Sequence, residues 1–193
     1  MNGRSAFLKY GKLIHFLVTV AKKMPRRVRR FILNVNRRKT SKVGFLMRYV
    51  AVASLAKHIG NNVAIFPDVY FEYIENLSIG DNVSIHQMCY IDAEGGIEIG
   101  NDVSIAHRST ILSGNHGYTD SSIPIKYQDM ILAKTVIQDN VWIGCGCVVL
   151  AGVVIGTGSV IGANSVVTKS ITKNSVAVGS PAKRIKARIK TEE

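Results

Sequence analysis

The chain has 193 residues, 47% of them hydrophobic, with 25 Lys and Arg against 13 Asp and Glu. This length fits one domain with an appendage, and 17 Gly and 4 Pro exclude the collagen-like and low-complexity classes. Three cysteines with no C-x-x-C motif argue against a disulfide framework and indicate a reducing compartment. The longest apolar run, residues 13–21, is too short to span a membrane and is not followed by a convincing signal-cleavage site, so we expect a cytoplasmic protein.

The charge is divided unevenly along the chain. Residues 1–58 hold 15 Lys and Arg and no acidic residue, whereas residues 59–193 hold 10 basic and 13 acidic residues. We name residues 1–58 the basic head and predict that it is a helical region. Apolar helical patterns cover residues 7–21 and 43–57, and between them apolar residues keep helical spacing among arginines (Val28, Phe31, Ile32 and Val35).

The sequence leaves three roles open for the basic head. Basic amphipathic helices commonly lie on anionic membranes, which predicts peripheral contact with the inner face of the cell membrane. In the second interpretation, the helices pack on the rest of the chain or on other subunits, with their arginines facing water. Nucleic-acid binding is not expected, because the arginine-rich stretch shows no pattern of interleaved aromatic residues for base stacking.

An internal repeat of six residues dominates the region 59–180. A large apolar residue recurs at this period, and all except Phe71 are Ile or Val: positions 59, 65 and 71; 79, 85 and 91; 99, 105 and 111; and 137, 143, 149, 155, 161 and 167. Each unit predicts a short strand and a tight turn in which Gly or Asn is favoured. Two extra residues follow every third unit at first, which indicates three strands per coil. The repeat therefore predicts a mainly β fold, a three-sided solenoid with a stacked Ile and Val core.

A long excursion, residues 112–135, interrupts this repeat. Loops that interrupt a rigid scaffold are where function is usually placed. His116 lies at the opening of the loop, directly after a predicted strand, and is therefore both anchored and projecting. From position alone, a solvated surface histidine is the alternative.

The repeats "IGTGSV" and "IGANSV" and the closing "VVTKSITKNSVAVGSPAKRIK" resemble the hexapeptide-repeat acyltransferases. The closing segment resembles the sugar O-acetyltransferase branch, which is related to galactoside and maltose acetyltransferases and to polysaccharide O-acetyltransferases. The resemblance covers about residues 59–188. It implies a left-handed parallel β-helix over residues 59–180, followed by a basic C-terminal tail, residues 181–193. It also implies acetyl-CoA as co-substrate, a carbohydrate acceptor and a homotrimer whose donor sites are shared between neighbours.

The resemblance implies a set of site residues. His116, in the "SGNH" element, corresponds to the general base, an imidazole that takes a proton from a sugar hydroxyl. Asp120, Asp92 or Glu94 could orient this ring, and the sequence does not choose among them. The expected contacts to acetyl-CoA are Trp142, Cys145, Ala163, Thr168, Lys169, Lys183 and Lys186. The expected contacts to the acceptor are Glu72, His86 and Glu94.

Some alternatives remain open for the chemistry. Cys145 is expected to contact the donor through its backbone rather than act as a thiol nucleophile, and Cys147 occupies an inward position of the repeat. The acceptor is expected to belong to a surface polysaccharide or to its lipid-linked or nucleotide-linked precursor, with an amino sugar and N-acetylation as the alternative. A non-catalytic binding solenoid is a further class. Hexapeptide carbonic anhydrases use three zinc-binding histidines, but His86, His107 and His116 lack that spacing, so we expect no metal requirement.

Overall fold

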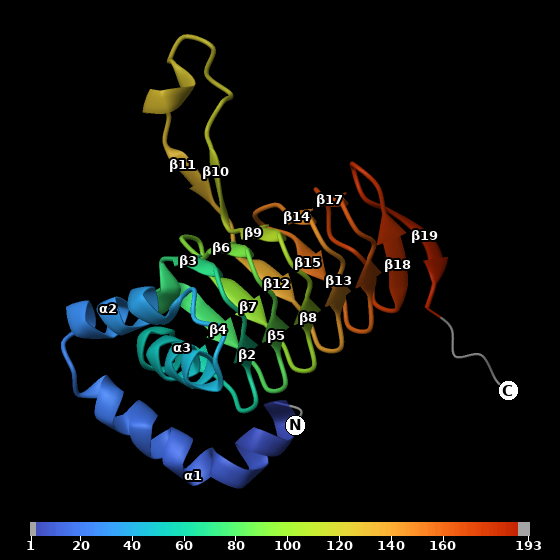
Figure 1. The fold of residues 1–193 in the computed structure, drawn as a ribbon. Helices are drawn as coiled ribbons and strands as arrows, with labels where there is room; N and C mark the ends of the chain where they lie inside the picture. Colours follow the sequence, from blue (N-terminus) through green and yellow to red (C-terminus); the bar gives the residue numbers. More distant parts are fainter. Residues whose placement is uncertain (1–2, 189–193) are drawn as a thin grey trace, which may run out of the picture.

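The computed structural model describes residues 3–188, and for residues 3–6 and 8 the backbone alone. Three helices pack at one end of a solenoid of short strands, and one hairpin projects from the side of the solenoid (Figure 1). The predicted mainly β fold with a helical N-terminal segment is confirmed.

Three sheets form the three sides of the solenoid, and each coil contributes one strand to each side. The first sheet contains β1 (His58–Ile59), β4 (Leu77–Ile79), β7 (Ile97–Ile99), β12 (Thr135–Ile137) and β15 (Val154–Ile155). The second contains β2 (Ala64–Ile65), β5 (Ser84–Ile85), β8 (Ser104–Ile105), β13 (Trp142–Ile143), β16 (Val160–Ile161), β18 (Ser175–Val178) and β19 (Lys183–Ala187). The third contains β3 (Tyr70–Glu72), β6 (Tyr90–Asp92), β9 (Thr110–Leu112), β14 (Val148–Val149) and β17 (Val166–Val167).

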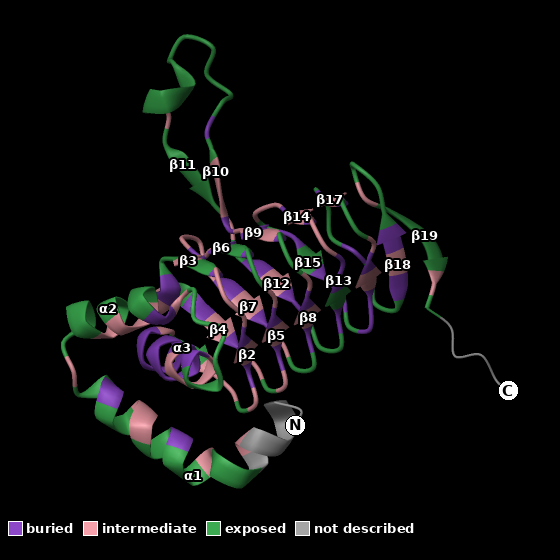
Figure 2. Ribbon diagram, in the orientation of Figure 1, coloured by how far each residue is buried: buried purple, intermediate pink, exposed green. Residues whose placement is uncertain are grey.

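The large residue of each repeat forms a buried ladder inside the solenoid. Parallel pairing aligns Ile79 with Ile99, and Ile85 with Ile105, so that identical positions stack from coil to coil. These four side chains are almost completely buried, and buried residues are coloured purple along the strands in Figure 2. Burying one Ile or Val side chain contributes about 1.5–3 kcal/mol, so the ladder accounts for much of the stability of the solenoid.

The turns between the first and second sheets explain the recurring Asn residues. Asn62, Asn82 and Asp102 stand at equivalent turn positions with φ of 54°, 58° and 56°. Asn and Asp tolerate this left-handed backbone better than other side-chain-bearing residues. Their side chains also bond between coils, because Asn62 Nδ2 donates to Asn82 Oδ1 at 2.9 Å and Asn82 Nδ2 donates to Asp102 Oδ1 at 3.0 Å.

The basic head forms α1 (Gly3–Lys22), α2 (Arg26–Asn36) and α3 (Lys42–Leu55). Ser41 begins α3 as an N-cap, because its hydroxyl accepts the backbone N–H of Gly44 at 3.2 Å. The second half of α3 is buried between the other two helices and the first coil. The predicted helices over 7–21 and 43–57 therefore differ from the observed ones only at their ends.

Two arginines of the basic head point inward, although the sequence predicts that the arginines of this region face water. Arg48 is 1% exposed and donates from Nε to the Ile65 carbonyl at 2.8 Å. Its Nη1 donates to the carbonyls of Asn36 at 2.8 Å and Lys39 at 2.6 Å, at and beyond the end of α2. Arg29 donates in the same way to the Ser54 carbonyl near the end of α3. Among these acceptors, the Asn36 and Ser54 carbonyls lie at helix ends, where carbonyl groups lack intrahelical partners.

The C-terminal segment contains a strand where the sequence predicts a basic tail. Lys183–Ala187 forms β19, which pairs antiparallel with β18 (Ser175–Val178) at the end of the second sheet. An added strand covers a sheet edge that would otherwise expose unpaired backbone groups. The remainder of the predicted tail, residues 189–193, lies outside the described residues.

Candidate active site

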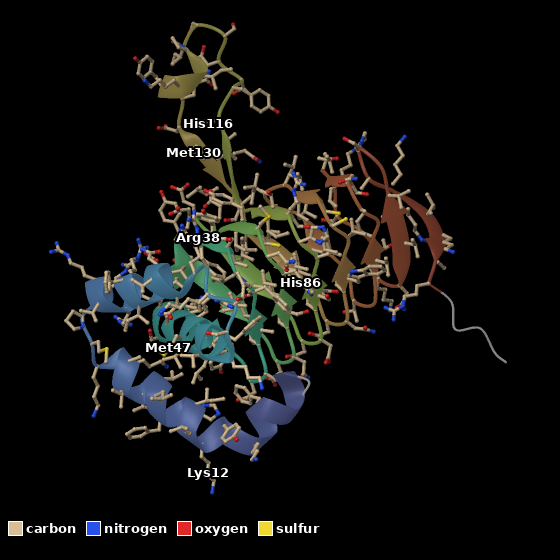
Figure 3. The ribbon with its side chains drawn as sticks, viewed as in Figure 1. Lys12, Arg38, Met47, His86, His116 and Met130 are labelled. Carbon is tan, nitrogen blue, oxygen red and sulfur yellow. The ribbon has the colours of Figure 1, made fainter. Side chains whose placement is uncertain are left out.

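The excursion forms an arm, residues 113–134, rather than an irregular loop. β10 (Gly114–His116) pairs antiparallel with β11 (Met130–Leu132), and a 3₁₀ turn, Ile125–Tyr127, lies near the far end. His116 is exposed and stands opposite Met130, outside the body of the solenoid (Figure 3). The arm leaves from the corner between the third and first sheets, where the shorter insertions also occur.

The three carboxylates expected to orient His116 have other partners. Asp120 accepts the Ser122 hydroxyl at 2.6 Å and the Ser122 backbone N–H at 2.8 Å. Asp92 accepts the backbone N–H of Glu94 at 3.3 Å, and the Glu94 carboxylate lies near Tyr73, whose pKa its charge raises. Among the described residues, no carboxylate is therefore held against His116 within one chain.

The base of the arm is fixed by side-chain and backbone bonds around Ser113. The Ser113 hydroxyl donates to the Asp92 carbonyl at 2.8 Å and accepts the Gly95 N–H at 2.9 Å. The Ser113 carbonyl accepts the N–H of Ala133, which directly follows the returning strand β11, at 2.9 Å. The direction in which the arm leaves the solenoid is thus set by both of its ends.

The second sheet carries Trp142 on its outer face. Trp142 alternates with the buried Ile143 on β13, and its side chain is 54% exposed. In the register of this sheet it lies between Ser104 and Val160. The same row continues through Val176 to Lys186 on β19. The structure therefore brings Trp142 and Lys186 to one face.

Cys145 and Ala163 lie at the corner between the second and third sheets. The Cys145 carbonyl accepts the N–H of Asn164, next to Ala163, at 2.8 Å. Cys147 lies in the core, as predicted, because its thiol is fully buried and donates to the Gly162 carbonyl at 3.1 Å. Burial raises the pKa of this Cys147 thiol, which disfavours the reactive thiolate.

Thr168 and Lys169 are separated from that corner. They follow β17, at the corner between the third and first sheets, so the third sheet lies between them and Ala163. Lys183 lies at the start of β19, opposite Val178 on β18. One chain thus divides the predicted donor contacts between two edges of the third sheet.

His86 lies at the corner that also carries Cys145. Its ring stacks on Phe66, with 4.4 Å between ring centroids and 8° between planes, and Phe66 contacts Phe45 edge to face. Burial, and then the neighbouring His107, lower the pKa of His86. Figure 3 places His86 on the solenoid body, away from His116 on the arm.

Three tyrosines and three carboxylates gather on and after β3 and β6, beside the base of the arm. This tyrosine–carboxylate cluster comprises Tyr70, Tyr73, Tyr90, Glu72, Asp92 and Glu94. The charge of Glu94 is the main cause that raises the pKa of Tyr73. Partial burial, and then Asp92, raise the pKa of Tyr90. The structure thus unites Glu72 and Glu94, two of the predicted acceptor contacts, but places His86 at a different corner.

Sequence reasoning did not predict the tyrosines of this cluster. Tyr70 and Tyr90 pair directly across β3 and β6, each one residue before a ladder position. Their 20-residue separation equals one coil with its two-residue insertion. This spacing in the sequence indicates that the two tyrosines lie side by side on neighbouring coils. The Arg37 guanidinium lies over the Tyr70 ring at 4.1 Å, which connects the cluster to α2.

The structure does not assemble the zinc site of the carbonic anhydrase alternative. Within residues 3–188, no group of three or more His, Cys, Asp or Glu side chains is arranged to hold a metal ion. His116 stands on the arm while His86 lies on the solenoid, so the three histidines do not converge in one chain (Figure 3).

Known proteins share both the repeat and the fold. The family described as bacterial transferase hexapeptide (six repeats) matches residues 134–169. A candidate acetyltransferase of Schizosaccharomyces pombe is 56% identical over 50 residues, which are 26% of this chain and 24% of that protein. The chain therefore matches only about a quarter of the length of this relative.

The structure of a galactoside acetyltransferase in complex with coenzyme A extends the similarity to most of the chain. It is 30% identical, with a TM-score of 0.76, and the alignment covers 85% of this chain and 80% of that one. The chain belongs to the hexapeptide-repeat acyltransferase family.

Two further structures resemble this acyltransferase. A hexapeptide-repeat acetyltransferase from Vibrio cholerae O1 biovar eltor, in complex with acetyl-CoA, is 25% identical with a TM-score of 0.76, covering 86% of this chain and 87% of that one. AntD, an N-acyltransferase from Bacillus cereus in complex with dTDP and 3-hydroxybutyryl-CoA, is 26% identical with a TM-score of 0.59, covering 70% and 85%. The chain therefore resembles a protein named for N-acylation as well as proteins named for acetyl transfer.

The pKa of His86 predicts how the stability of the acyltransferase depends on pH. Because the folded-state pKa lies below the ordinary value, the unfolded chain binds the His86 proton first as pH falls. The contribution of neutral His86 to the free energy of unfolding is complete above the ordinary histidine pKa of about 6.5 and is lost as pH falls below it. We expect His86→Asn to reduce the loss of Tm between pH 7.5 and pH 5, measured by thermal unfolding. An unchanged pH dependence in this variant would contradict the assignment.

The acyltransferase should also be sensitive to a methyl group at Gly95. A Cβ at Gly95 would overlap the Ser113 carbonyl oxygen and lie 2.9 Å from the Ala133 nitrogen, which are backbone atoms at the two ends of the arm. We expect Gly95→Ala to lower the free energy of unfolding by about 1–3 kcal/mol and to speed amide hydrogen exchange at the base of the arm. Gly11→Ala is the control, because its Cβ would meet only the Phe7 side chain at 4.0 Å. Equal exchange at the arm base in both variants would refute this account.

Proposed function

We propose that the chain is an acetyl-CoA-dependent O-acetyltransferase that acts on a sugar hydroxyl, with His116 as the general base. The observation that carries this proposal is the arm, which carries the exposed His116 and whose base adjoins the tyrosine–carboxylate cluster, because a Cβ at Gly114 would lie 3.6 Å from Glu94 Oε2. The family membership supplies the acyl-transfer chemistry, and the residues of this chain supply the means to bind an acceptor.

The proposed reaction needs one proton acceptor and one stabilised oxyanion. The His116 imidazole takes the proton of the sugar hydroxyl as the sugar oxygen forms a bond to the thioester carbonyl carbon. Backbone N–H groups near Cys145 stabilise the negative charge on the carbonyl oxygen. When the C–S bond breaks, the imidazolium returns the proton to the departing thiolate of coenzyme A. The step requires neither an acyl-enzyme nor the thiol of Cys145.

The predicted donor contacts suit the parts of acetyl-CoA. The half-exposed indole of Trp142 and the neighbouring Val160 offer an apolar surface for the pantetheine arm. The corner at Cys145 and Ala163 offers backbone groups for its amides. Lysine side chains suit phosphates as point charges, and these are exposed on or near the C-terminal strands (Lys169, Lys183 and Lys186).

The acceptor proposed for the tyrosine–carboxylate cluster is a sugar. Exposed tyrosine rings can pack against the apolar face of a sugar ring, and carboxylates accept hydrogen bonds from hydroxyl groups. We place the acceptor in a surface polysaccharide or its lipid-linked or nucleotide-linked precursor, and the enzyme in the cytoplasm. His86, at the corner between the second and third sheets, is proposed to contact the acceptor or the reacting groups.

A homotrimer is part of the proposal, because one chain does not complete the site. The arm exposes many apolar side chains, including Tyr118, Ile125, Tyr127, Ile131 and Leu132. Large exposed apolar patches on a protein usually mark an interaction surface. In a trimer, the arm of one subunit would reach the donor face of its neighbour and bring His116 to Trp142 and Cys145.

We expect sedimentation equilibrium to give three times the 21.1 kDa monomer mass. Replacing Ile125 and Tyr127 together with Ser should shift the protein toward monomer, because exposing apolar surface to water is unfavourable. Lys126→Ser, between these two residues, is the matched control and should stay trimeric. A stable monomer of the unmodified protein at micromolar concentration would overturn the shared site.

The activity is tested by acetyl transfer from labelled acetyl-CoA to nucleotide-sugars, lipid-linked sugars and free glycans. An O-acetyl product is an ester that mild alkali cleaves, whereas an N-acetyl product is an amide that survives. The similarity to AntD makes N-acylation of an amino sugar the second candidate, and this treatment distinguishes the two. Binding of acceptors with no transfer of label would instead support a non-catalytic solenoid.

A further inference from the structure

The basic head exposes an unusual number of large apolar side chains. On α1 these are Tyr10, Leu13, Phe16 and Val20, and on α2 they are Val28, Phe31 and Val35; we name these seven residues the apolar stripe. Each is between 39% and 66% exposed, on helices that also pack against α3. Figure 2 shows exposed residues along both helices.

Helical spacing places the stripe residues of each helix on one side. Val28, Phe31 and Val35 follow the i, i+3, i+7 pattern, and the α1 residues have a similar spacing. On α1, the buried residues Ile14 and Ala21 lie about 100° around the helix from Leu13 and Val20, next to Tyr10 at one margin of the stripe. Each helix therefore carries apolar side chains on its outer side as well as on the side that packs. Exposing this apolar surface to water is unfavourable, and such a patch is typical of an interaction surface.

Positive charges accompany the apolar stripe, and residues 1–58 contain no acidic residue. Exposed cations adjoin the stripe at Lys9, Lys12, Lys23 and Arg27. Within residues 3–188, none of these four forms an ion pair, whereas Arg26 and Arg30 pair with Glu75 of the solenoid. Among the described residues these outer cations thus have no acidic partner, and the Lys9 ammonium lies over the Tyr10 ring, 5.4 Å from its centroid. Lys12 points away from the body in Figure 3.

We propose that the basic head lies on an anionic lipid membrane, with the apolar stripe at the level of the acyl chains and the outer cations among the headgroups. A bilayer with anionic headgroups satisfies both features together. A second copy pressed stripe to stripe would instead bring like charges together. No helix within residues 3–188 is long and apolar enough to cross a membrane, so the contact lies in the surface plane.

This placement, which rests in part on the proposed function, favours a lipid-linked acceptor. The side of α2 away from its stripe carries Arg30 and Arg37, which line a cavity of about 170 Å³ together with Tyr70 and Glu72 of the tyrosine–carboxylate cluster. Helix α2 thus lies between the proposed membrane surface and the proposed acceptor site. A sugar attached to a membrane lipid would meet the enzyme at this end.

The test measures co-sedimentation of the full chain with vesicles of phosphatidylcholine alone or with about 30% phosphatidylglycerol. We expect binding about tenfold or more stronger on the anionic vesicles, with release in about 1 M salt. Leu13→Ser/Phe16→Ser and Lys9→Glu/Lys12→Glu should each weaken binding about tenfold or more. The matched controls are Val154→Ser, an exposed apolar residue of the first sheet, and Lys173→Glu, an exposed cation of the solenoid, and both should bind normally.

Three results would overturn the proposal. They are equal binding to neutral and anionic vesicles, full binding by the stripe variant, and a fall in oligomer mass when the stripe is replaced. The last result would identify the stripe as a contact between copies of the chain. Vesicle binding is read without any acetyl transfer, so its failure leaves the proposed O-acetyltransferase activity standing. Loss of transfer to every acceptor with vesicle binding intact would reject the activity alone.

Discussion

We expect the replacement of His116 with Ala to lower kcat by about 10²- to 10⁴-fold, equivalent to roughly 3–5.5 kcal/mol of barrier, because the proposed reaction loses its general base. The measurement is steady-state transfer from acetyl-CoA at one fixed pH, with KM for acetyl-CoA recorded alongside kcat.

The position of His116 separates this catalytic effect from a structural one. Its side chain is exposed on the arm and does not belong to the buried ladder, so Tm and acetyl-CoA binding should hardly change. Tyr118→Ala, on the same arm and also exposed, is a control for disturbance of the arm itself. If His116→Ala keeps more than a tenth of kcat, another residue is the base, and His86 is the first to test.

The sequence predicts the solenoid because the fold repeats one physical requirement. Each coil must bury an Ile or Val at the same three places, so the period of the ladder reveals both the three sides and the corner where insertions occur. The helices of the basic head follow from apolar spacing in the same way. The break in the period also locates the arm and the place of His116 at its opening.

Features outside the repeat could not be predicted in this way. The arm is a hairpin whose direction depends on local hydrogen bonds around Ser113, and the period of the repeat does not predict such bonds. The tyrosines of the cluster occupy outward positions, where the core imposes no residue type. The split of the donor contacts between two edges becomes visible only when Ala163 and Thr168 are placed on their corners.

Arg48 shows a related limit of reasoning from composition. It is one of 15 cations in the basic head, and the charge total cannot tell which of them is buried. Its three donated hydrogen bonds join the end of α2, the following turn and the first coil of the solenoid. Burial lowers its pKa, with Asp68 acting in the opposite sense, and arginine nevertheless stays charged.

Arg48→Ala should therefore reduce the free energy of unfolding by about 3 kcal/mol or more, because the Ile65 and Lys39 carbonyls lose the Arg48 donor and the Asn36 carbonyl keeps only the Lys39 N–H. Arg48→Lys should recover little, since an ammonium group cannot reproduce the planar fork that reaches the Ile65, Asn36 and Lys39 carbonyls. Arg38→Ala is the matched control, because the Arg38 side chain is 79% exposed and its ion pair with Asp68 is a surface contact. Denaturant unfolding gives the stabilities, and limited proteolysis shows whether the basic head detaches from the solenoid. Equal stability of the Arg48→Ala and Arg38→Ala proteins would mean that the inward arginine does not hold the basic head in place.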